Sequence, residues 1–201
     1  MKLSVISLDY IFPGEEEVLC YFFENGIEYL VMRKPQNIEK DIVHLINRIP
    51  SKYHNRIIIQ DRFSLLKQFN LNGILLSKKS PRAPQLDKRF SKSVACGQIG
   101  DIVRYQNFYH IFFGPVFDSI SKKIKPAFEE TALREAKERN IINDKTIAVG
   151  GIDENTIPEA RMYGFEHVAV LGSLWKNYPA DNNKEALYAR FNRLMELTQI
   201  K

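Results

Sequence analysis

The sequence predicts a closed (β/α)8 barrel, the TIM-barrel fold, formed as a single domain by residues 1–201. Eight short, near-continuous apolar runs alternate with segments of helical spacing along the whole chain. Near-continuous apolarity, rather than strict in-out alternation, is typical of parallel strands covered on both faces. Eight such strands fit a closed barrel better than an open doubly wound sheet.

The predicted strands are these apolar runs, each of strand length. They cover residues 3–8, 29–32, 56–59, 73–76, 93–96, 110–117, 146–149 and 167–171.

The predicted helices carry apolar residues three or four positions apart, which form one core-facing stripe. They lie around residues 18–23, 38–49, 132–136 and 187–195.

Local signals predict where some of these helices begin and end. Three glutamates follow Gly14, and Asn37 precedes the sequence IEKD; both patterns are typical of helix starts. Gly26 and Gly164 are expected to end helices.

Two connections lack a helical pattern. Residues 77–90 contain two prolines and no apolar period, so we expect no regular helix after the fourth strand. Residues 97–109 are also weak as a helix.

Composition narrows the class of protein. With 44% hydrophobic and 26% charged residues, the chain is typical of a soluble globular protein. No run of about 18 apolar residues and no secretory signal is present, so we expect no membrane association and a cytoplasmic location. Cys20 and Cys96 lie in apolar stretches, which predicts reduced, buried thiols.

The net charge of +5 raises the question of nucleic-acid binding. The Lys and Arg residues are scattered, and no nucleic-acid-binding motif accompanies them, so we expect no nucleic-acid partner. Weak basicity suits anionic small molecules equally well.

The residues that follow the predicted strands are rich in cations, hydroxyls and glycines. Active-site groups of a (β/α)8 barrel lie at this end of the strands. Arg offers a bidentate fork to phosphate oxygens, Lys a compact charge, and Gly a closely approaching backbone N–H. The set is Asp9; Arg33 and Lys34; Gln60, Asp61 and Arg62; Ser77, Lys78, Lys79 and Ser80; Gly97 and Gln98; Asp118, Ser119, Ser121, Lys122 and Lys123; Gly150 and Gly151; and Gly172 and Ser173.

Glycines follow both of the last two strands, in VGGI at 149–152 and LGS at 171–173. Barrel enzymes often hold a substrate phosphate at these places. Each glycine alone could equally serve a tight turn, but the two sites together favour phosphate binding.

Asp61 ends an apolar run, where a carboxylate must be paired, hydrated or bound to a cation. One interpretation is a buried salt bridge to Arg33 or Arg62. The other is a Mg²⁺ ligand that works together with substrate phosphate oxygens and water. The run Lys78-Lys79 has a plainer interpretation, as part of a solvated loop. The four histidines show no metal-ligand spacing.

The strand-end motifs resemble those of the thiamine-phosphate synthase family, which includes TenI-like paralogues. FFGPVFDSISKK (112–123) is similar to the family's GPVF-x-T-x-T-K block. TIAVGGI (146–152) and VAVLGSL (168–174) are similar to its AIGGI and VAVVSAI blocks, IIIQDR (57–62) to IINDR, and VMRK (31–34) to QLREK. The matches occur in the expected order and cover most of the chain.

The resemblance implies roles for individual residues. Arg33 and Lys122 match the family's diphosphate-binding cations, and Asp61 its Mg²⁺-binding Asp. The implied substrate-binding residues are Gln60, Ser93, Ser119, Ser121, Gly151, Gly172 and Ser173. Ser119 and Ser121 replace two threonines and keep a hydroxyl, while Gly151 and the Gly172-Ser173 turn match the cradle of the thiazole phosphate.

The sequence also departs from the family pattern. The second Lys of QLREK falls on Pro35, next to Lys34, which leaves open whether Lys34 substitutes for it. The second Mg²⁺ carboxylate falls on Ser80, and the family His falls on Ala95 or Gly97 according to register. Lys78 or Lys79 could supply part of the charge that a weakened Mg²⁺ site no longer neutralises.

The function that the resemblance implies is coupling of hydroxymethylpyrimidine diphosphate to thiazole phosphate, with release of pyrophosphate and with Mg²⁺ as cofactor. The alternative is a TenI-like paralogue, tautomerase-like or regulatory, that binds thiazole or thiamine phosphates without coupling them. A phosphosugar isomerase is a third possibility, disfavoured because the strand ends offer no Glu-His pair. Homo-oligomerisation is possible, with Trp175 as a candidate contact residue.

Overall fold

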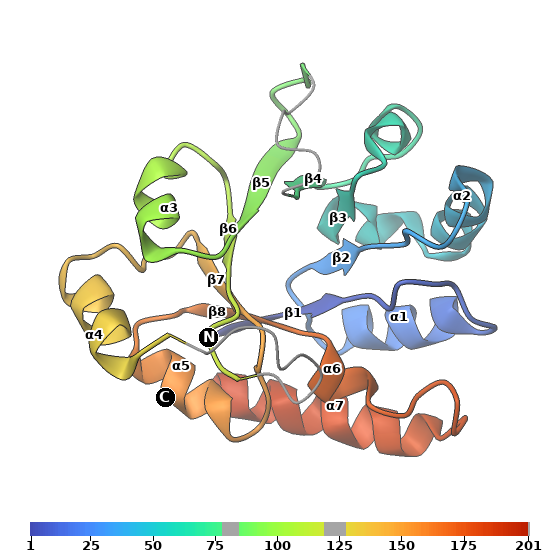
Figure 1. Cartoon of the computed structure of the whole chain (residues 1–201). Coiled ribbons are helices and arrows are strands. Elements are labelled where there is room, and N and C mark those ends of the chain that lie inside the picture. The colour runs from blue at the N-terminus through green and yellow to red at the C-terminus, as the bar shows by residue number, and fades with distance from the viewer. Residues whose placement is uncertain (78–84, 119–127, 201) are drawn as a thin grey trace.

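Eight parallel strands in the described residues form a closed barrel in the order β1-β2-β3-β4-β5-β6-β7-β8, which confirms the predicted fold. The structure is a computed structural model that describes residues 1–77, 85–118 and 128–200. Helices lie on the outside of the strands (Figure 1). Because all strands run in parallel, their C-terminal ends meet at one mouth of the barrel and their N-terminal ends at the other.

Each predicted strand is present, with small shifts at the ends. The strands are β1 (Lys2–Ile6), β2 (Leu30–Met32), β3 (Ile57–Gln60), β4 (Gly73–Leu76), β5 (Ser91–Cys96), β6 (Ile111–Phe113), β7 (Thr146–Val149) and β8 (His167–Val170). The sixth strand is shorter than predicted and ends before Gly114 and Pro115, since Pro cannot donate to the ladder.

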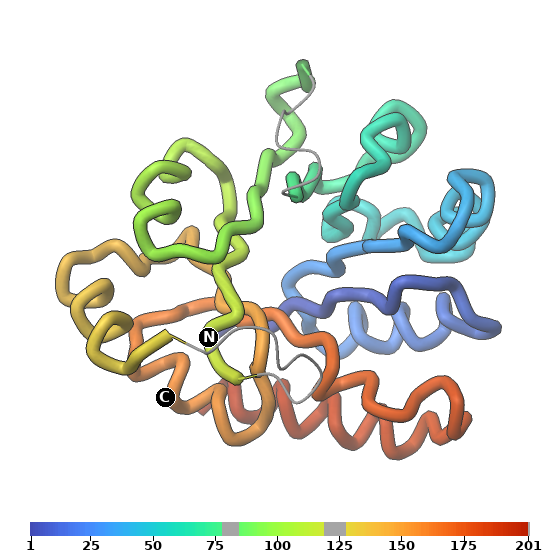
Figure 2. The backbone as a smooth tube through the Cα atoms, in the orientation of Figure 1, coloured from blue at the N-terminus to red at the C-terminus, as the bar shows by residue number. Residues whose placement is uncertain are grey.

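The barrel closes between its first and last strands. Lys2 lies opposite His167, and Val5 opposite Val170. In Figure 2 the blue segment that begins the chain lies beside the orange segment of β8.

The helices of the described residues agree with the apolar spacing. They are α1 (Glu15–Glu24), α2 (Glu39–Arg48), α3 (Ile99–Arg104), α4 (Glu130–Glu138), α5 (Thr156–Met162), α6 (Gly172–Trp175) and α7 (Lys184–Gln199), with 3-10 turns η1 (Ser51–Arg56) and η2 (Phe63–Lys67). Residues 97–109 form only the short α3, as their weak pattern predicts. Residues 85–90 contain no helix, and residues 78–84 lie outside the described part.

The helix signals are confirmed except at Asn37. Helix α1 begins at Glu15, and Gly26 (φ 97°) and Gly164 (φ 86°) follow α1 and α5. Helix α2 begins one residue later than Asn37 predicts, with Ile38 as its N-cap. The Asn37 side chain instead accepts a hydrogen bond of 2.9 Å from the Ile11 backbone N–H, so it fastens the loop after β1.

Two apolar clusters make up the core. The larger one lies between the outer face of the sheet and the helices, and the smaller one fills the barrel. The buried residues of the inner cluster are Val31, Ile58, Leu75, Phe112, Ile147 and Ala169. Along each strand, therefore, alternate residues face the two clusters.

Two expectations about buried side chains are wrong. Cys20 is not buried but partly exposed, because it lies at the edge of the face of α1 that packs on the sheet, whereas Cys96 is buried. Trp175 is not available for a subunit contact, because its side chain is only 1% exposed and its indole N–H donates to the Ile6 carbonyl at 2.8 Å.

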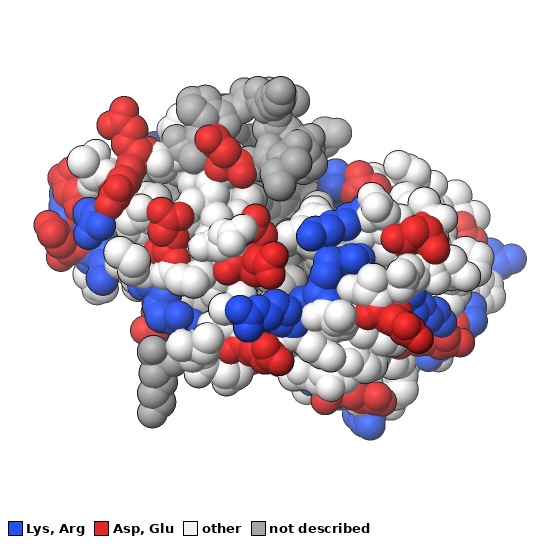
Figure 3. Space-filling view, turned by 90° about the horizontal axis from the view of Figure 1, so that it is seen from below, with Lys and Arg blue, Asp and Glu red and all other residues white. Residues whose placement is uncertain are grey.

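The surface carries both signs of charge. On the face in Figure 3, a short group of Lys and Arg side chains lies near the centre with Asp and Glu on either side. No helix in the described residues has both the length and the apolar character that a membrane crossing requires.

Candidate active site

The predicted site residues in the described part gather at the C-terminal mouth of the barrel. Arg33 follows β2 and Asp61 follows β3. Gly151 follows β7, and Gly172 begins α6 directly after β8. Residues distant in the sequence therefore share one mouth, as the parallel topology requires.

Arg33 is held in place by the end of the neighbouring strand. Its guanidinium donates to a carboxylate oxygen of Asp9, and its backbone N–H donates to the Ser7 hydroxyl at 3.0 Å. The Ser7 hydroxyl in turn lies 3.2 Å from the Arg33 carbonyl. About a third of the Arg33 side chain remains exposed (35%), so an anion can reach the guanidinium.

Lys34 faces away from this mouth. Its side chain is fully buried, and its ammonium donates to Glu15 at 2.5 Å and to the Tyr10 carbonyl at 2.7 Å. Burial raises the pKa of Glu15 to about 7 and lowers the pKa of Lys34, although each opposite charge acts against the effect of burial. Lys34 is thus committed to the layer between β2 and α1 and does not take the place of the family's second Lys.

Asp61 is exposed at the mouth and is oriented by two polar neighbours. One carboxylate oxygen accepts from Gln60 Nε2 at 3.1 Å, and the other from the Ser77 hydroxyl at 3.3 Å. Its backbone has a φ of 60°, a left-handed conformation that Asp tolerates better than most residues.

The alternative of a buried salt bridge at Asp61 is wrong. Asp61 is exposed, and among the described residues Arg33 pairs with Asp9 while Arg62 donates to the Asn37 carbonyl. No Lys or Arg of the described residues forms an ion pair with Asp61, so within that part of the chain its carboxylate keeps its capacity to bind a cation.

The geometry of Asp61 fits a divalent cation that is bound mainly by substrate. Within residues 1–77, 85–118 and 128–200, no group of three or more His, Cys, Asp or Glu could hold a metal ion. Mg²⁺ is often bound by one or two carboxylates together with substrate phosphates and water. A single exposed and oriented carboxylate meets that requirement.

The glycine pair after β7 is required by the backbone conformation and by close packing. Gly150 and Gly151 have φ values of 84° and 68°, which favour glycine. A Cβ on Gly151 would lie 2.6 Å from the Phe117 carbonyl oxygen. The turn therefore packs closely against the segment after β6.

Ser173 connects the turns after β7 and β8. Its hydroxyl donates to the Ile152 carbonyl at 2.6 Å. The Thr156 hydroxyl donates to the Gly151 carbonyl at 2.8 Å, which fixes the first of the two turns. These two hydrogen bonds hold the turns after β7 and β8 together at the mouth. We call the surface formed by Gly151, Gly172 and Ser173 the ledge.

Ser93 lies inside the barrel and is fully buried. It faces the interior together with its register partner Leu75, and its hydroxyl has no hydrogen-bond partner among the described residues. Its role as a substrate contact stays a prediction.

Several predicted residues lie outside the described residues. These are Lys78, Lys79, Ser80, Ser119, Ser121 and Lys122.

None of the four histidines of the chain lies at the C-terminal mouth. His44 is exposed on α2. His54 Nε2 lies within hydrogen-bond distance of the carbonyl oxygens of Ile46 and Ile49, at 3.1 and 2.9 Å. His110 and His167 lie at the opposite end of the barrel, at the start of β6 and β8. No imidazole is therefore available to replace the family His.

The sequence list of strand-end residues contained Asp9 and Ser77, but it could not give their partners. Asp9 orients Arg33, and Ser77 orients Asp61. Their position after the first and fourth strands was the only signal, because pairing between neighbouring strand ends depends on register.

Comparisons with known proteins agree on one family. A family model for thiamine monophosphate synthase matches residues 15–174. A thiamine-phosphate synthase from Clostridium tetani is 26% identical over 173 residues, which cover 81% of this chain and 82% of that protein.

Solved structures lead to the same result. A crystal structure of thiamine phosphate pyrophosphorylase from Bacteroides thetaiotaomicron is 32% identical, with a TM-score of 0.89 over 100% of this chain and 99% of the other. The thiamine phosphate pyrophosphorylase from Pyrococcus furiosus is similar in fold, with 15% identity and a TM-score of 0.77 over 98% and 95% of the two chains. Together with the motifs at the barrel mouth, these matches show that the chain belongs to the thiamine monophosphate synthase family, a family of transferases in thiamine biosynthesis.

Proposed function

We propose that the protein couples hydroxymethylpyrimidine diphosphate to thiazole phosphate and releases pyrophosphate. The observation that carries this proposal is the placement of Arg33 and Asp61 at the ends of the neighbouring strands β2 and β3. An oriented cation and an exposed carboxylate on neighbouring strand ends are what a diphosphate with a bound divalent cation requires.

In the proposed reaction, the bond between the pyrimidine methylene carbon and the diphosphate oxygen breaks, and its electron pair stays on pyrophosphate. The thiazole nitrogen then forms the new bond to the methylene carbon. Arg33 binds the diphosphate and stabilises its growing negative charge, because its guanidinium is already oriented by Asp9. Lys122 is proposed to assist it.

Asp61, oriented by Gln60 and Ser77, would hold Mg²⁺ against the diphosphate. When bound, Mg²⁺ supplies charge neutralisation to the leaving group. Because the family's second carboxylate is Ser80 here, we expect the ion to be held weakly until the diphosphate arrives.

The ledge made by Gly151, Gly172 and Ser173 is proposed to bind the thiazole phosphate. Its backbone N–H groups are accessible because the glycines carry no side chain. Ser93, Ser119 and Ser121 are proposed as further substrate contacts.

The tautomerase-like alternative is not favoured. The resemblance ties that reaction to a His on the fifth strand, and this chain has Ala95 and Gly97 there. The histidines that it does have lie elsewhere in the fold. We propose a cytoplasmic enzyme with phosphorylated small molecules as partners, and homo-oligomerisation remains possible.

A direct assay tests the proposal. Purified protein is mixed with both substrates and Mg²⁺, and thiamine phosphate and pyrophosphate are measured by mass spectrometry and ³¹P NMR. We expect equal amounts of the two products, and none when either substrate is omitted. Absence of thiamine phosphate, with both substrates shown to bind, would reject coupling as the function.

A further inference from the structure

A cavity lies at the opposite end of the barrel from the candidate active site. Its volume is about 1240 Å³, and it is lined by the starts of the strands, including Lys2, Tyr29, Ser91, His110 and His167. This volume exceeds the ~300–1000 Å³ of typical small-molecule sites. The candidate active-site residues line the other mouth, so the cavity belongs to neither the substrate site nor its loops.

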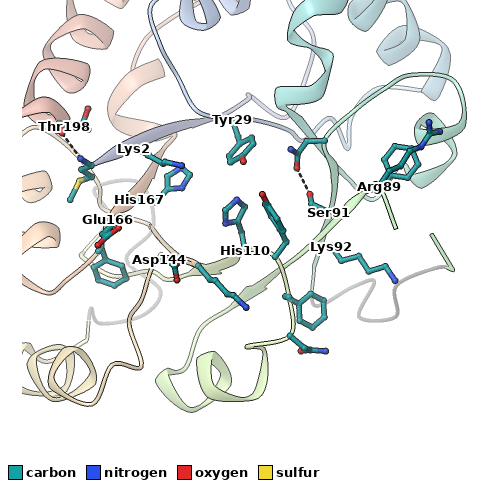
Figure 4. Close-up of a pocket in the computed structure, with 18 of the residues that line it drawn as sticks. Lys2, Tyr29, Arg89, Ser91, Lys92, His110, Asp144, Glu166, His167 and Thr198 are labelled. Carbon is teal, nitrogen blue, oxygen red and sulfur yellow. Dashed lines mark hydrogen bonds between the residues drawn. The ribbon is translucent and has the colours of Figure 1, made fainter. Parts of the chain in front are cut away.

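The floor of this cavity is made of aromatic and polar rings rather than branched apolar residues. Figure 4 shows Tyr29, His110 and His167 converging from three strand starts. The Tyr29 ring lies 5.2 Å from that of His110, and the two imidazoles are 5.8 Å apart between centroids. Barrel interiors are normally filled by bulky branched side chains, so this layer is unusual in its chemistry.

Hydrogen-bonding capacity is left over at this end of the barrel. Both ring nitrogens of His110 are buried without a partner among the described residues. Buried polar groups without a partner are costly, which favours an occupant that supplies one.

An exposed aromatic ring stands at the rim. Tyr109 is 55% exposed, and its ring lies 4.6 Å from that of His110. It offers a flat face to a planar ligand at the entrance to the ring cluster.

The charge of the lining favours an anion. Among the described residues that line the cavity, six are Lys or Arg and three are Asp or Glu. Lys92 has no ion-pair partner in that part of the chain, so its ammonium is available. The charge of Lys2 reaches both imidazoles, whose pKa values are lowered mainly by burial and then by neighbouring positive charge.

A metal ion does not account for these features. Only two imidazoles meet here, and His167 Nε2 already lies 2.8 Å from the Ser4 hydroxyl. In the described part of the chain, no cluster of His, Cys, Asp and Glu has the size that a metal site needs.

We propose that this cavity binds a planar heteroaromatic molecule that carries a phosphate. The ring stacks on Tyr109, above the cluster of Tyr29, His110 and His167, and the phosphate pairs with Lys92. The site is separate from the substrate site and does not depend on the proposed function. A ligand here can regulate the protein without competing with substrate.

Adenosine monophosphate is a suitable probe, because it combines a planar base with one phosphate. Isothermal titration calorimetry of the whole protein is expected to show one binding site in the micromolar range. Adenosine and ribose 5-phosphate separate the contributions of ring and phosphate, and each is expected to bind at least about tenfold more weakly. If ribose 5-phosphate binds as tightly as adenosine monophosphate, the ring contributes nothing to the affinity and the proposal is overturned.

Four variants locate the binding. Tyr109→Ala and Lys92→Glu are each expected to weaken adenosine monophosphate binding by about tenfold. Lys40→Glu, an exposed change on α2, and Arg33→Ala, at the other mouth, are expected to leave it unchanged. Circular dichroism checks that each variant is folded.

Two results would overturn the assignment of the site. One is no detectable binding of adenosine monophosphate at about 2 mM. The other is binding that Arg33→Ala abolishes and Lys92→Glu retains, because that result places the ligand at the C-terminal mouth.

Discussion

The carboxylate of Asp9 accepts a hydrogen bond from the guanidinium of Arg33, across the gap between the ends of β1 and β2. Both side chains are more than a third exposed, at 38% and 35%, so the pair adds little to stability. Its effect is geometric: it fixes the direction in which a phosphate-binding cation points.

Asp9→Ala is therefore predicted to lower kcat/KM by about tenfold while the melting temperature stays within a few degrees. Pyrophosphate affinity should change less, because loss of a repelling carboxylate offsets the loss of orientation. Steady-state kinetics and calorimetry separate the two effects. Arg33→Ala is the comparison, because it should lower both kcat/KM and the affinity for pyrophosphate. An unchanged kcat/KM in Asp9→Ala would show that Asp9 does not position Arg33.

Asp61→Asn is predicted to abolish the dependence of pyrophosphate binding on Mg²⁺. The amide keeps the size and one of the two acceptor oxygens, but it removes the charge that attracts the cation. Calorimetric titrations with and without Mg²⁺ measure the difference. Asp41→Asn, an exposed change on α2, serves as the matched control, and a Mg²⁺ effect that persists in Asp61→Asn would contradict the proposed metal site.

Lys34→Met is predicted to destabilise the protein by about 3–5 kcal/mol at pH 8, because it leaves the buried Glu15 without a partner. The double variant Glu15→Gln/Lys34→Met should recover much of this loss. Urea unfolding of the wild type, both single variants and the double variant completes the cycle. If the double variant loses as much as the two single variants summed, the pair is not coupled.

Gly151→Ala is predicted to destabilise the protein and to weaken thiazole phosphate binding. The residue has a φ of 68°, and a Cβ would lie within 3 Å of the Phe117 backbone. Gly100→Ala is the matched control: it lies in α3 with nothing within 4 Å of the new Cβ, so a gain of about 0.5–1 kcal/mol is expected. Thermal unfolding and calorimetry measure the two effects, and a neutral Gly151→Ala would contradict a rigid ledge.

The buried imidazoles predict a loss of stability in acid. Burial lowers the pKa of His110 to about 4 and that of His167 to about 3, from an ordinary 6.5. Stability from these groups is fully present above pH 6.5 and is lost as pH falls toward 4 and below, with a slope approaching ~1.4 kcal/mol per pH unit for each.

Glu15 acts in the opposite direction, because its raised pKa of about 7 favours the folded state as pH falls from 7 to 4.5. The test is therefore a comparison between variants. Urea unfolding at pH 7.5 and 5 should show a shallower acid loss in His110→Phe than in the wild type, while the exposed His44→Gln keeps the wild-type slope. Identical slopes in all three would contradict a buried, neutral His110.

The alternation of apolar runs was enough to predict the barrel and the mouth at which its polar residues gather. The helix start at Asn37 was wrong because its amide bonds to Ile11, which a local capping pattern does not reveal. The burial of Trp175 and the partial exposure of Cys20 depend on which helix packs over which strand. The local sequence shows the periodicity of strands and helices. The burial and the hydrogen-bond partners of these side chains depend instead on contacts between distant parts of the chain.

The direction of Lys34 illustrates the same limit at the site. Arg33 and Lys34 follow β2 directly, and their side chains take different directions: Arg33 lies at the mouth, whereas Lys34 is buried against Glu15. The two residues alone do not show which of them is buried, because that depends on how β2 pairs with β1 and β3.

The order of Arg33 and Lys34 along the chain therefore matters. A chain with Lys at position 33 and Arg at position 34 would have the same composition and the same net charge, and its sequence would match relatives almost as well. It would nevertheless bury a guanidinium against α1 and offer a flexible ammonium to the diphosphate. In searches for working members of this family, the exact position of the Arg after its strand is therefore a stricter criterion than the presence of basic residues nearby.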